Sequence, residues 1–181
     1  MKIISLFDGI ACARVAFDRA NIPVEFYTSI EFDKYARQVA DYNYPDIARP
    51  CNDVREYIGC TEYDLLIGGS PCQDLSIAKK NRKGLDGERS GLFFEYVRIL
   101  KACRPKYFIL ENVASMHKDA KAQITAILTE IYPDTEVHMI NAALVSAQNR
   151  KRFFWTNIKG ITQPEDKHIF LKDILEPKIE E

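Results

Sequence analysis

Short apolar runs alternate with helical patterns along almost the whole chain, and this alternation limits the fold more than any other feature. The apolar runs predict strands at residues 3–7, 24–31, 63–67, 107–110, 137–145 and 152–158. Helical patterns between them cover residues 12–19, 33–42, 92–103 and 120–131, and Asp33 is a suitable N-cap for the second. Strands separated by helices predict an α/β fold, with a mostly parallel sheet covered by helices on both faces.

The composition is typical of one soluble domain with a single core, since the chain has 181 residues and is 46% hydrophobic and 28% charged. No apolar run approaches the roughly 20 residues of a membrane span, and the N-terminus has no signal-peptide cleavage region. Five cysteines without a CxxC pair argue against disulfides and a metal site, and favour a cytoplasmic protein. With a net charge of −1, any nucleic-acid binding has to rely on local basic patches.

The strand at 63–67 ends in the strongest local signal of the chain, Gly68-Gly69-Ser70-Pro71-Cys72. Pro71 fixes its own φ and favours an extended Ser70, so the next side chain is held on a rigid corner. The carboxyl ends of strands are where open α/β sheets place their chemistry. Most cysteines are buried core residues, and we interpret the other four in that way. A thiol held at this corner instead predicts that Cys72 is a nucleophile.

A long polar segment follows Cys72 directly. Residues 78–91 are basic and punctuated by glycines, which predicts a loop. Loops of this length are usually functional lids or disordered, and the position beside Cys72 favours a lid.

A second site, for a nucleotide-like cofactor, is indicated where the first strand runs into the tight turn Phe7-Asp8-Gly9-Ile10. Glu31 lies about 20 residues further on, where a carboxylate can bind ribose hydroxyls. Because the turn has one glycine and no GxGxxG, a cofactor with a ribose but no phosphates fits best. Asp53, near the expected end of a third strand, could receive an adenine amino group. The alternative for both carboxylates is an exposed helix cap or loop position.

Charged residues at two further strand ends complete the candidate chemistry. Glu111 follows the apolar run 107–110, so it is expected at the same sheet edge as Cys72. A half-buried carboxylate there can donate or share a proton, although a structural ion pair is the alternative. Strand alternation predicts that Arg150 and Arg152 point to one side, which suits a phosphate or carboxylate; a solvated basic edge is the alternative.

In order and spacing, these motifs resemble those of the DNA cytosine-5 methyltransferases. The matching motifs are Phe7-Asp8-Gly9, Glu31, Asp53-Val54, Gly68–Gln73, Glu111-Asn112-Val113 and Gln148-x-Arg150-x-Arg152. The amino-acid sequence of residues 5–11 and 91–95 is most similar to that of the branch of the de novo-type enzymes, which has phage and bacterial members. The resemblance implies a Rossmann-like class I fold dependent on S-adenosylmethionine, with residues 1–160 as the catalytic domain and double-stranded DNA as the partner.

The resemblance also assigns roles. Cys72 adds to carbon 6 of a flipped-out cytosine, Glu111 protonates or hydrogen-bonds the ring nitrogen, and Arg152 helps to hold the base. Arg150 and Asn112 complete the catalytic set. The implied cofactor-binding residues, with Phe7 against the adenine, are Phe7, Asp8, Gly9, Ile10, Glu31, Phe32, Asp53, Val54, Ser70, Pro71 and Leu92. The implied nucleic-acid contacts are Gln73, Ser76, Lys79, Lys80, Arg82 and Arg89.

Family members usually continue into a target-recognition region, and residues 161–181 resemble the start of that region or a C-terminal tail. Three interpretations stay open for the rest: a truncated chain, one subunit of a split enzyme, and a short remnant. Three other functions also stay open, namely a regulatory partner without turnover, a tRNA cytosine-5 methyltransferase and a nucleotide-dependent oxidoreductase. The missing glycine fingerprint disfavours the oxidoreductase.

Overall fold

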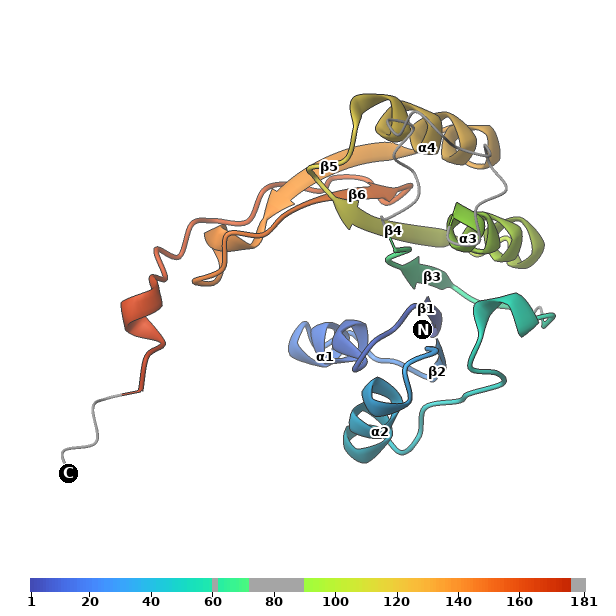
Figure 1. Ribbon diagram of the computed structural model, residues 1–181, viewed down its shortest axis with the longest axis horizontal. Coiled ribbons are helices and arrows are strands. Elements are labelled where there is room, and N and C mark those ends of the chain that lie inside the picture. Colours follow the sequence, from blue (N-terminus) through green and yellow to red (C-terminus); the bar gives the residue numbers. More distant parts are fainter. Residues whose placement is uncertain (60–61, 72–89, 177–181) are drawn as a thin grey trace, which may run out of the picture.

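The computed structural model describes residues 1–59, 62–71 and 90–176, and it confirms the predicted alternation of strands and helices (Figure 1). The main elements are β1 (Lys2–Leu6), α1 (Cys12–Arg19), β2 (Phe26–Ile30), α2 (Lys34–Asn43), β3 (Leu65–Gly68), α3 (Ser90–Cys103), β4 (Tyr107–Val113), α4 (Lys118–Ile131), β5 (Glu136–Asn141) and β6 (Lys151–Thr156). Within these residues the chain also forms short 3-10 helices: η1 (Val54–Glu56), η3 (Ala142–Leu144) and η4 (Leu171–Asp173).

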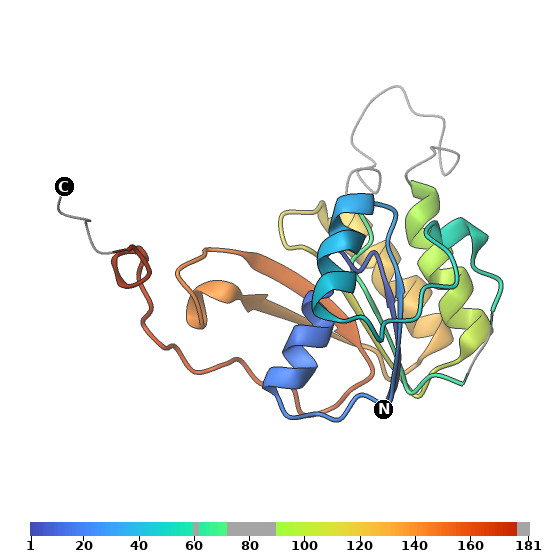
Figure 2. The same cartoon turned by 90° about the horizontal axis from the view of Figure 1, so that it is seen from below.

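The strands form one sheet in the order β2-β1-β3-β4-β6-β5. The first four are parallel, whereas β6 runs antiparallel to both β4 and β5. Helices α3 and α4 cover one face, and α1 covers the other, with α2 beside α1 near β2 (Figures 1 and 2). The predicted mostly parallel sheet with helices on both faces is therefore confirmed.

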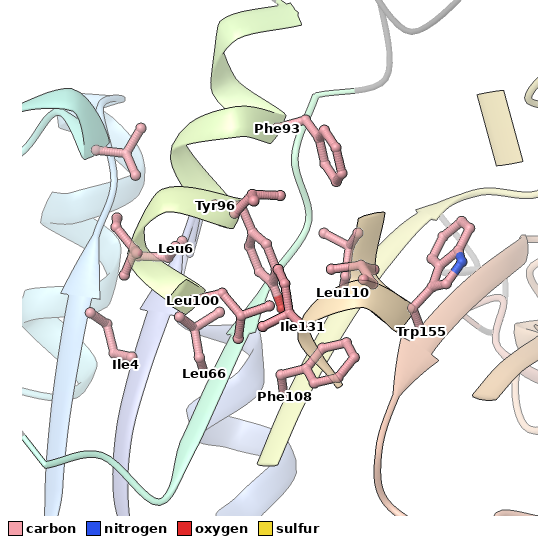
Figure 3. Close-up of a cluster of buried hydrophobic side chains, with 14 of the residues drawn as sticks. Ile4, Leu6, Leu66, Phe93, Tyr96, Leu100, Phe108, Leu110, Ile131 and Trp155 are labelled. Carbon is pink, nitrogen blue, oxygen red and sulfur yellow. The ribbon is translucent and has the colours of Figure 1, made fainter. Parts of the chain in front are cut away.

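The larger core lies between the sheet and the pair α3 and α4 (Figure 3). Helix α4 buries one side chain per turn on a single face: Ala120, Ile124, Leu128 and Ile131. Trp155 of β6 is fully buried there, and its indole nitrogen donates to Thr125 Oγ1 over 2.8 Å. A smaller cluster around Tyr27 packs against Phe17 of α1 on the opposite face. Burial on both faces explains why the central strands β3 and β4 begin with continuous apolar runs.

Several element ends differ from the sequence prediction, and side-chain hydrogen bonds or prolines account for the clearest cases. The predicted strand 137–145 stops at Asn141, whose side chain accepts from Ala143 N and begins η3. The prediction of a third strand ending near Asp53 is wrong, because this segment forms only a single parallel bridge, between Ala48 and Thr28. Pro45 and Pro50 flank that bridge, and proline cannot donate to a ladder.

Two other differences affect the site. Strand β4 continues to Val113, so Glu111 lies inside the strand rather than after it. Ser90 and Gly91, expected in the loop 78–91, belong to α3, and the rest of that loop lies outside the described residues.

Beyond β6, the chain runs along β5 and then leaves the body of the molecule (Figures 1 and 2). Gln163 Nε2 donates to Met139 O, and Lys167 N donates to Leu144 O, both over 2.8 Å. The division of the chain near residue 160 stays a prediction. Within the described parts of the chain, no helix is both long and apolar enough to cross a membrane.

Candidate functional site

The candidate site lies at the carboxyl edge of the sheet, where the parallel strands β1 to β4 all end. Strand β6 runs the opposite way and therefore begins at this edge, with Arg152 paired to Val113 of β4. Gly69 follows β3 directly. The fold thus brings the predicted Glu111 and Arg152 next to the end of the strand that leads to Cys72.

The Glu111 carboxylate lies between the guanidinium of Arg152 and the backbone of Gly69. Its Oε1 lies 2.5 Å from Arg152 Nε, and both side chains are half-buried. A Cβ atom on Gly69 would lie only 2.7 Å from the other oxygen, Glu111 Oε2. Gly69 therefore leaves the space that the carboxylate occupies, which accounts for a glycine at this position.

Asn112 points to the opposite face of the sheet and is buried. Its Nδ2 donates to the carbonyl oxygen of Ser70 over 3.2 Å, and its Oδ1 accepts from Val113 N over 2.8 Å. This amide ties β4 to the segment that ends at Pro71. Asn112 therefore holds the backbone at Ser70, two residues before Cys72, which itself lies outside the described residues.

Arg150 lies directly before β6. Its backbone nitrogen donates to Asn141 Oδ1, and its carbonyl oxygen accepts from Ala142 N, both over 3.0 Å. That the side chains of Arg150 and Arg152 point to one side stays a prediction. Both residues line an open pocket where β6 begins.

That pocket has a volume of about 490 Å³ and is lined by Ala114, Ser115, Gln148, Asn149, Arg150, Lys151 and Arg152. Three of these residues are cationic, and none of the described residues that line the pocket is acidic. Such a lining suits phosphate groups. Sequence reasoning missed Lys151 and Ser115, although Lys151 lies within a recognised motif.

The turn after β1 holds Glu31 through backbone amides. Phe7, Gly9 and Ala11 all have left-handed backbone conformations, with φ between 57° and 64°. Alternating left-handed residues can turn successive N–H groups towards one side, which favours a bound anion. Gly9 N donates to Glu31 Oε2 over 2.7 Å, and Asp33 N donates to Oε1 over 2.8 Å. Each oxygen keeps a further acceptor position for a ligand hydroxyl.

Asp8 sits under the same turn in a buried polar network. Its Oδ1 accepts from Ser5 Oγ over 2.6 Å and from Tyr27 OH over 2.7 Å. Its Oδ2 is buried and has no hydrogen-bond partner among the described residues, which fits a donor brought by a ligand. Burial raises the pKa of Tyr27, and the Asp8 charge raises it further, so the phenol remains a donor.

Sequence reasoning missed Ser5 and Tyr27, and also Arg37, which donates to the carbonyl oxygens of Glu31 and Phe32. Polar side chains at buried strand positions were the only available signal for Ser5 and Tyr27.

Asp53 caps η1 rather than a strand, since its Oδ1 accepts from Arg55 N over 2.9 Å. The hydrogen bonds from Arg55 lower the pKa of Asp53, so its carboxylate is charged. Arg98 of α3 fixes η1 by donating to the carbonyl oxygens of Val54 and Tyr57 over 3.1 and 2.9 Å. The buried side chain of Val54 anchors the same element in the main core.

The remaining predicted residues fall into three groups. Ile10 and Phe32 are exposed beside the turn, at 49% and 74%, and are therefore open to a flat ring. Ser70 and Leu92 are buried and half-buried, whereas Pro71 is exposed. The predicted nucleic-acid contacts lie outside the described residues: Gln73, Ser76, Lys79, Lys80, Arg82 and Arg89.

Comparisons with known proteins show the family of the chain. The family model of the C-5 cytosine-specific DNA methylases matches residues 1–180. Type II methyltransferase M.NgoPII of Neisseria gonorrhoeae is 34% identical over 97% of this chain and 56% of its own length. Orphan methyltransferase M.SPRI of Bacillus phage SPR is 30% identical over 88% of this chain and 38% of its own. The chain spans about a third to just over half the length of such relatives.

Solved structures show the same fold. A DNA modification methyltransferase encoded within an E. coli prophage has a TM-score of 0.74 and 22% identity, covering 99% of this chain and 56% of that one. Dnmt2 methyltransferase of S. pombe has a TM-score of 0.69 and 19% identity, covering 90% and 53%. The sheet and its helices therefore form the Rossmann-like fold of methyltransferases that use S-adenosylmethionine.

Proposed function

The chain belongs to the C-5 cytosine-specific DNA methylase family, and from this premise we propose that it carries the catalytic part of a DNA cytosine-5 methyltransferase. One observation supports this most directly. Glu111, paired with Arg152, lies against Gly69 at the end of the strand that leads to Cys72. Methylation of carbon 5 requires an acid and a thiol, and Cys72 follows Gly69 by three residues in the sequence.

S-adenosylmethionine, the methyl donor of this family, supplies an electrophilic methyl group when bound. The residues at the turn fit it: Glu31 has acceptor positions for ribose hydroxyls, and Asp8 Oδ2 can accept from a further donor. We assign Phe7 and Phe32 to the adenine ring and Asp53 to its amino group. The other predicted cofactor residues, Gly9, Ile10, Val54, Ser70, Pro71 and Leu92, complete the lining.

The proposed reaction begins with the thiol. Carbon 5 of cytosine is a poor nucleophile, and addition of the Cys72 thiolate to carbon 6 forms a carbon–sulfur bond that makes carbon 5 reactive. Negative charge then develops on the ring nitrogen, where Glu111 donates a proton or a hydrogen bond. After methylation, carbon 5 loses its proton to solvent, the carbon–sulfur bond breaks with its electron pair on sulfur, and any proton on the ring nitrogen returns to Glu111, so that the thiolate and the carboxyl group are restored.

Arg152 and Asn112 keep these groups in place. The Arg152 guanidinium holds the carboxylate through Nε, and its Nη1 donates to the carbonyl oxygen of Lys151 over 2.9 Å. Asn112 fixes the backbone just before the nucleophile. The target base must leave the duplex to reach these groups, and the basic pocket beside Arg152 suits the phosphates that flank it. The loop before α3 is proposed to close over the base.

The test is a covalent adduct with duplex DNA that contains 5-fluorocytosine, because fluorine cannot leave in the elimination step. With any missing recognition region supplied in trans, the wild-type chain is expected to form the adduct in the presence of S-adenosylmethionine, and Cys72→Ser to form none. Cys12→Ala is the matched control: Cys12 is an exposed free cysteine and not the core residue expected from the sequence, and its replacement should leave the adduct unchanged. An adduct that survives Cys72→Ala would show that the nucleophile is another residue. Glu111→Gln should keep its folding and cofactor binding but lose about 100-fold or more in rate.

Target recognition is proposed to come from outside residues 1–181, either from further chain or from a second subunit. The length of the relatives supports this. Net charge near zero and local basic clusters leave few phosphate contacts, so DNA affinity of these residues alone should be poor at physiological salt. Robust sequence-specific methylation by residues 1–181 alone would contradict this point. The proposed setting is the cytoplasm of a bacterial or phage-infected cell.

A further inference from the structure

The Asp53 carboxylate, assigned above to the adenine amino group, is bound by Arg55 at both of its oxygens. Oδ1 accepts from the backbone nitrogen of Arg55 over 2.9 Å and from Arg55 Nε over 3.0 Å. Oδ2 accepts from Arg55 Nε over 3.0 Å and from Nη2 over 2.5 Å. The single Nε proton is shared between the two oxygens, so three N–H groups of Arg55 engage the carboxylate. An incoming amino group therefore has to compete with the guanidinium for the same two oxygens.

The two partners differ in how easily they can move. The Asp53 side chain is 15% exposed, and its backbone belongs to the element that Arg98 and Val54 fix to α3. The Arg55 side chain is 60% exposed. Ion pairs with an exposed partner contribute little to stability, so the guanidinium is the donor that can be displaced.

We infer that Arg55 competes with the adenine amino group for Asp53 and so sets how tightly the chain binds adenine-containing ligands. The inference rests on the proposed function, because it takes Asp53 as the acceptor of that amino group. Arg55 is thus an affinity-determining residue that acts through Asp53. Its position two residues after Asp53 lets one guanidinium reach both oxygens while the backbone nitrogen keeps the cap.

The experiment measures binding of S-adenosylhomocysteine, the demethylated product, by calorimetry. Arg55→Ala is expected to bind it about two- to five-fold more tightly than wild type, the range that corresponds to an exposed ion pair. The gain should shrink as salt rises, since salt already weakens the pair in wild type. Arg19→Ala, which removes an exposed arginine from the last turn of α1, is the matched control and should bind as wild type does.

Two further measurements separate competition from a general effect of charge. In Asp53→Asn the cap oxygen remains but the ion pair is lost, so adding Arg55→Ala should change nothing. An analogue with a carbonyl oxygen in place of the adenine amino group has no proton there to donate, and Arg55→Ala should not tighten its binding.

If wild type binds S-adenosylhomocysteine and Arg55→Ala binds it equally well or more weakly, the proposed competition is wrong, and the proposed function is unaffected. Tightening that persists in Asp53→Asn would also overturn it. If wild type and Arg55→Ala both fail to bind the ligand, the proposed function fails, and this inference fails with it.

Discussion

Gly69→Ala is the sharpest perturbation that the site offers, because it adds one methyl group beside the proposed acid. The new Cβ would lie 2.7 Å from Glu111 Oε2, whereas ordinary contacts of this kind begin at 3.4 Å. The carboxylate therefore has to retreat by about 0.7 Å, the difference between these distances. Gly69 does not have a left-handed conformation, so the backbone accepts alanine without strain.

The displaced atom is the far end of a flexible side chain, so the fold should survive the change while the chemistry suffers. A misplacement approaching 1 Å can cost about 100-fold in rate, and this is the loss expected for methyl transfer. Binding of S-adenosylhomocysteine should stay at the wild-type level, since Glu111 is not among the residues assigned to it.

Gly68→Ala is the matched control one residue earlier. There the new Cβ would lie 2.8 Å from the carbonyl oxygen of Leu6 and 3.2 Å from the buried ring of Tyr96. Neither can move away freely, so this variant should lose about 1–3 kcal/mol of unfolding free energy. The assays are thermal unfolding and methyl transfer, with the C-terminal portion of a curated relative supplied in trans where needed. A wild-type rate for Gly69→Ala, or a stability loss equal to that of Gly68→Ala, would refute the reasoning.

Three further outcomes are expected. Tyr96→Phe should keep or raise the unfolding free energy in urea by up to about 1 kcal/mol, because the buried hydroxyl has no partner among the described residues; a larger loss would contradict this. Arg98→Ala should lower stability by about 1–3 kcal/mol and weaken S-adenosylhomocysteine binding several-fold, because it releases η1; unchanged calorimetric affinity would count against it. Arg55 lowers the folded-state pKa of Asp53, so the ionised carboxylate stabilises the fold above the ordinary value of 3.8, and this stabilisation is lost as pH falls through the lower pKa. Asp53→Asn should therefore reduce the loss of unfolding free energy at acid pH, and an unchanged pH dependence would refute the link.

The sequence was sufficient for the architecture because each element carries its own local signal. The central strands are apolar runs since both of their faces are buried, and Asp33 caps α2 through its own side chain, as predicted. The prediction was wrong where one or two residues determine the end of a secondary-structure element. Asn141 ends β5 four residues before the predicted end at 145, and two prolines reduce the expected third strand to one bridge.

The same distinction applies to the site. Glu111 and Arg152 could be found because they accompany recognisable strands, and the antiparallel β6 then brings them together. Whether they act as proposed stays a prediction. Ser5 and Tyr27 could not be found as supports of Asp8, because nothing in an apolar strand marks which polar residue faces a turn elsewhere in the chain.

The contacts that position the site connect residues far apart in sequence. Asn112 reaches Ser70 across 42 positions, and Arg98 reaches Val54 across 44. Such contacts leave no local pattern, because each depends on two elements that meet only once the sheet has formed. It follows that a substitution can spare every motif residue and still disable the site. Arg98 is the clearest case, since it belongs to none of the motifs and yet its guanidinium holds the element that carries Asp53. The motifs therefore specify which groups do the chemistry, and the packing of α3 on the sheet determines whether Asp53 is held in place.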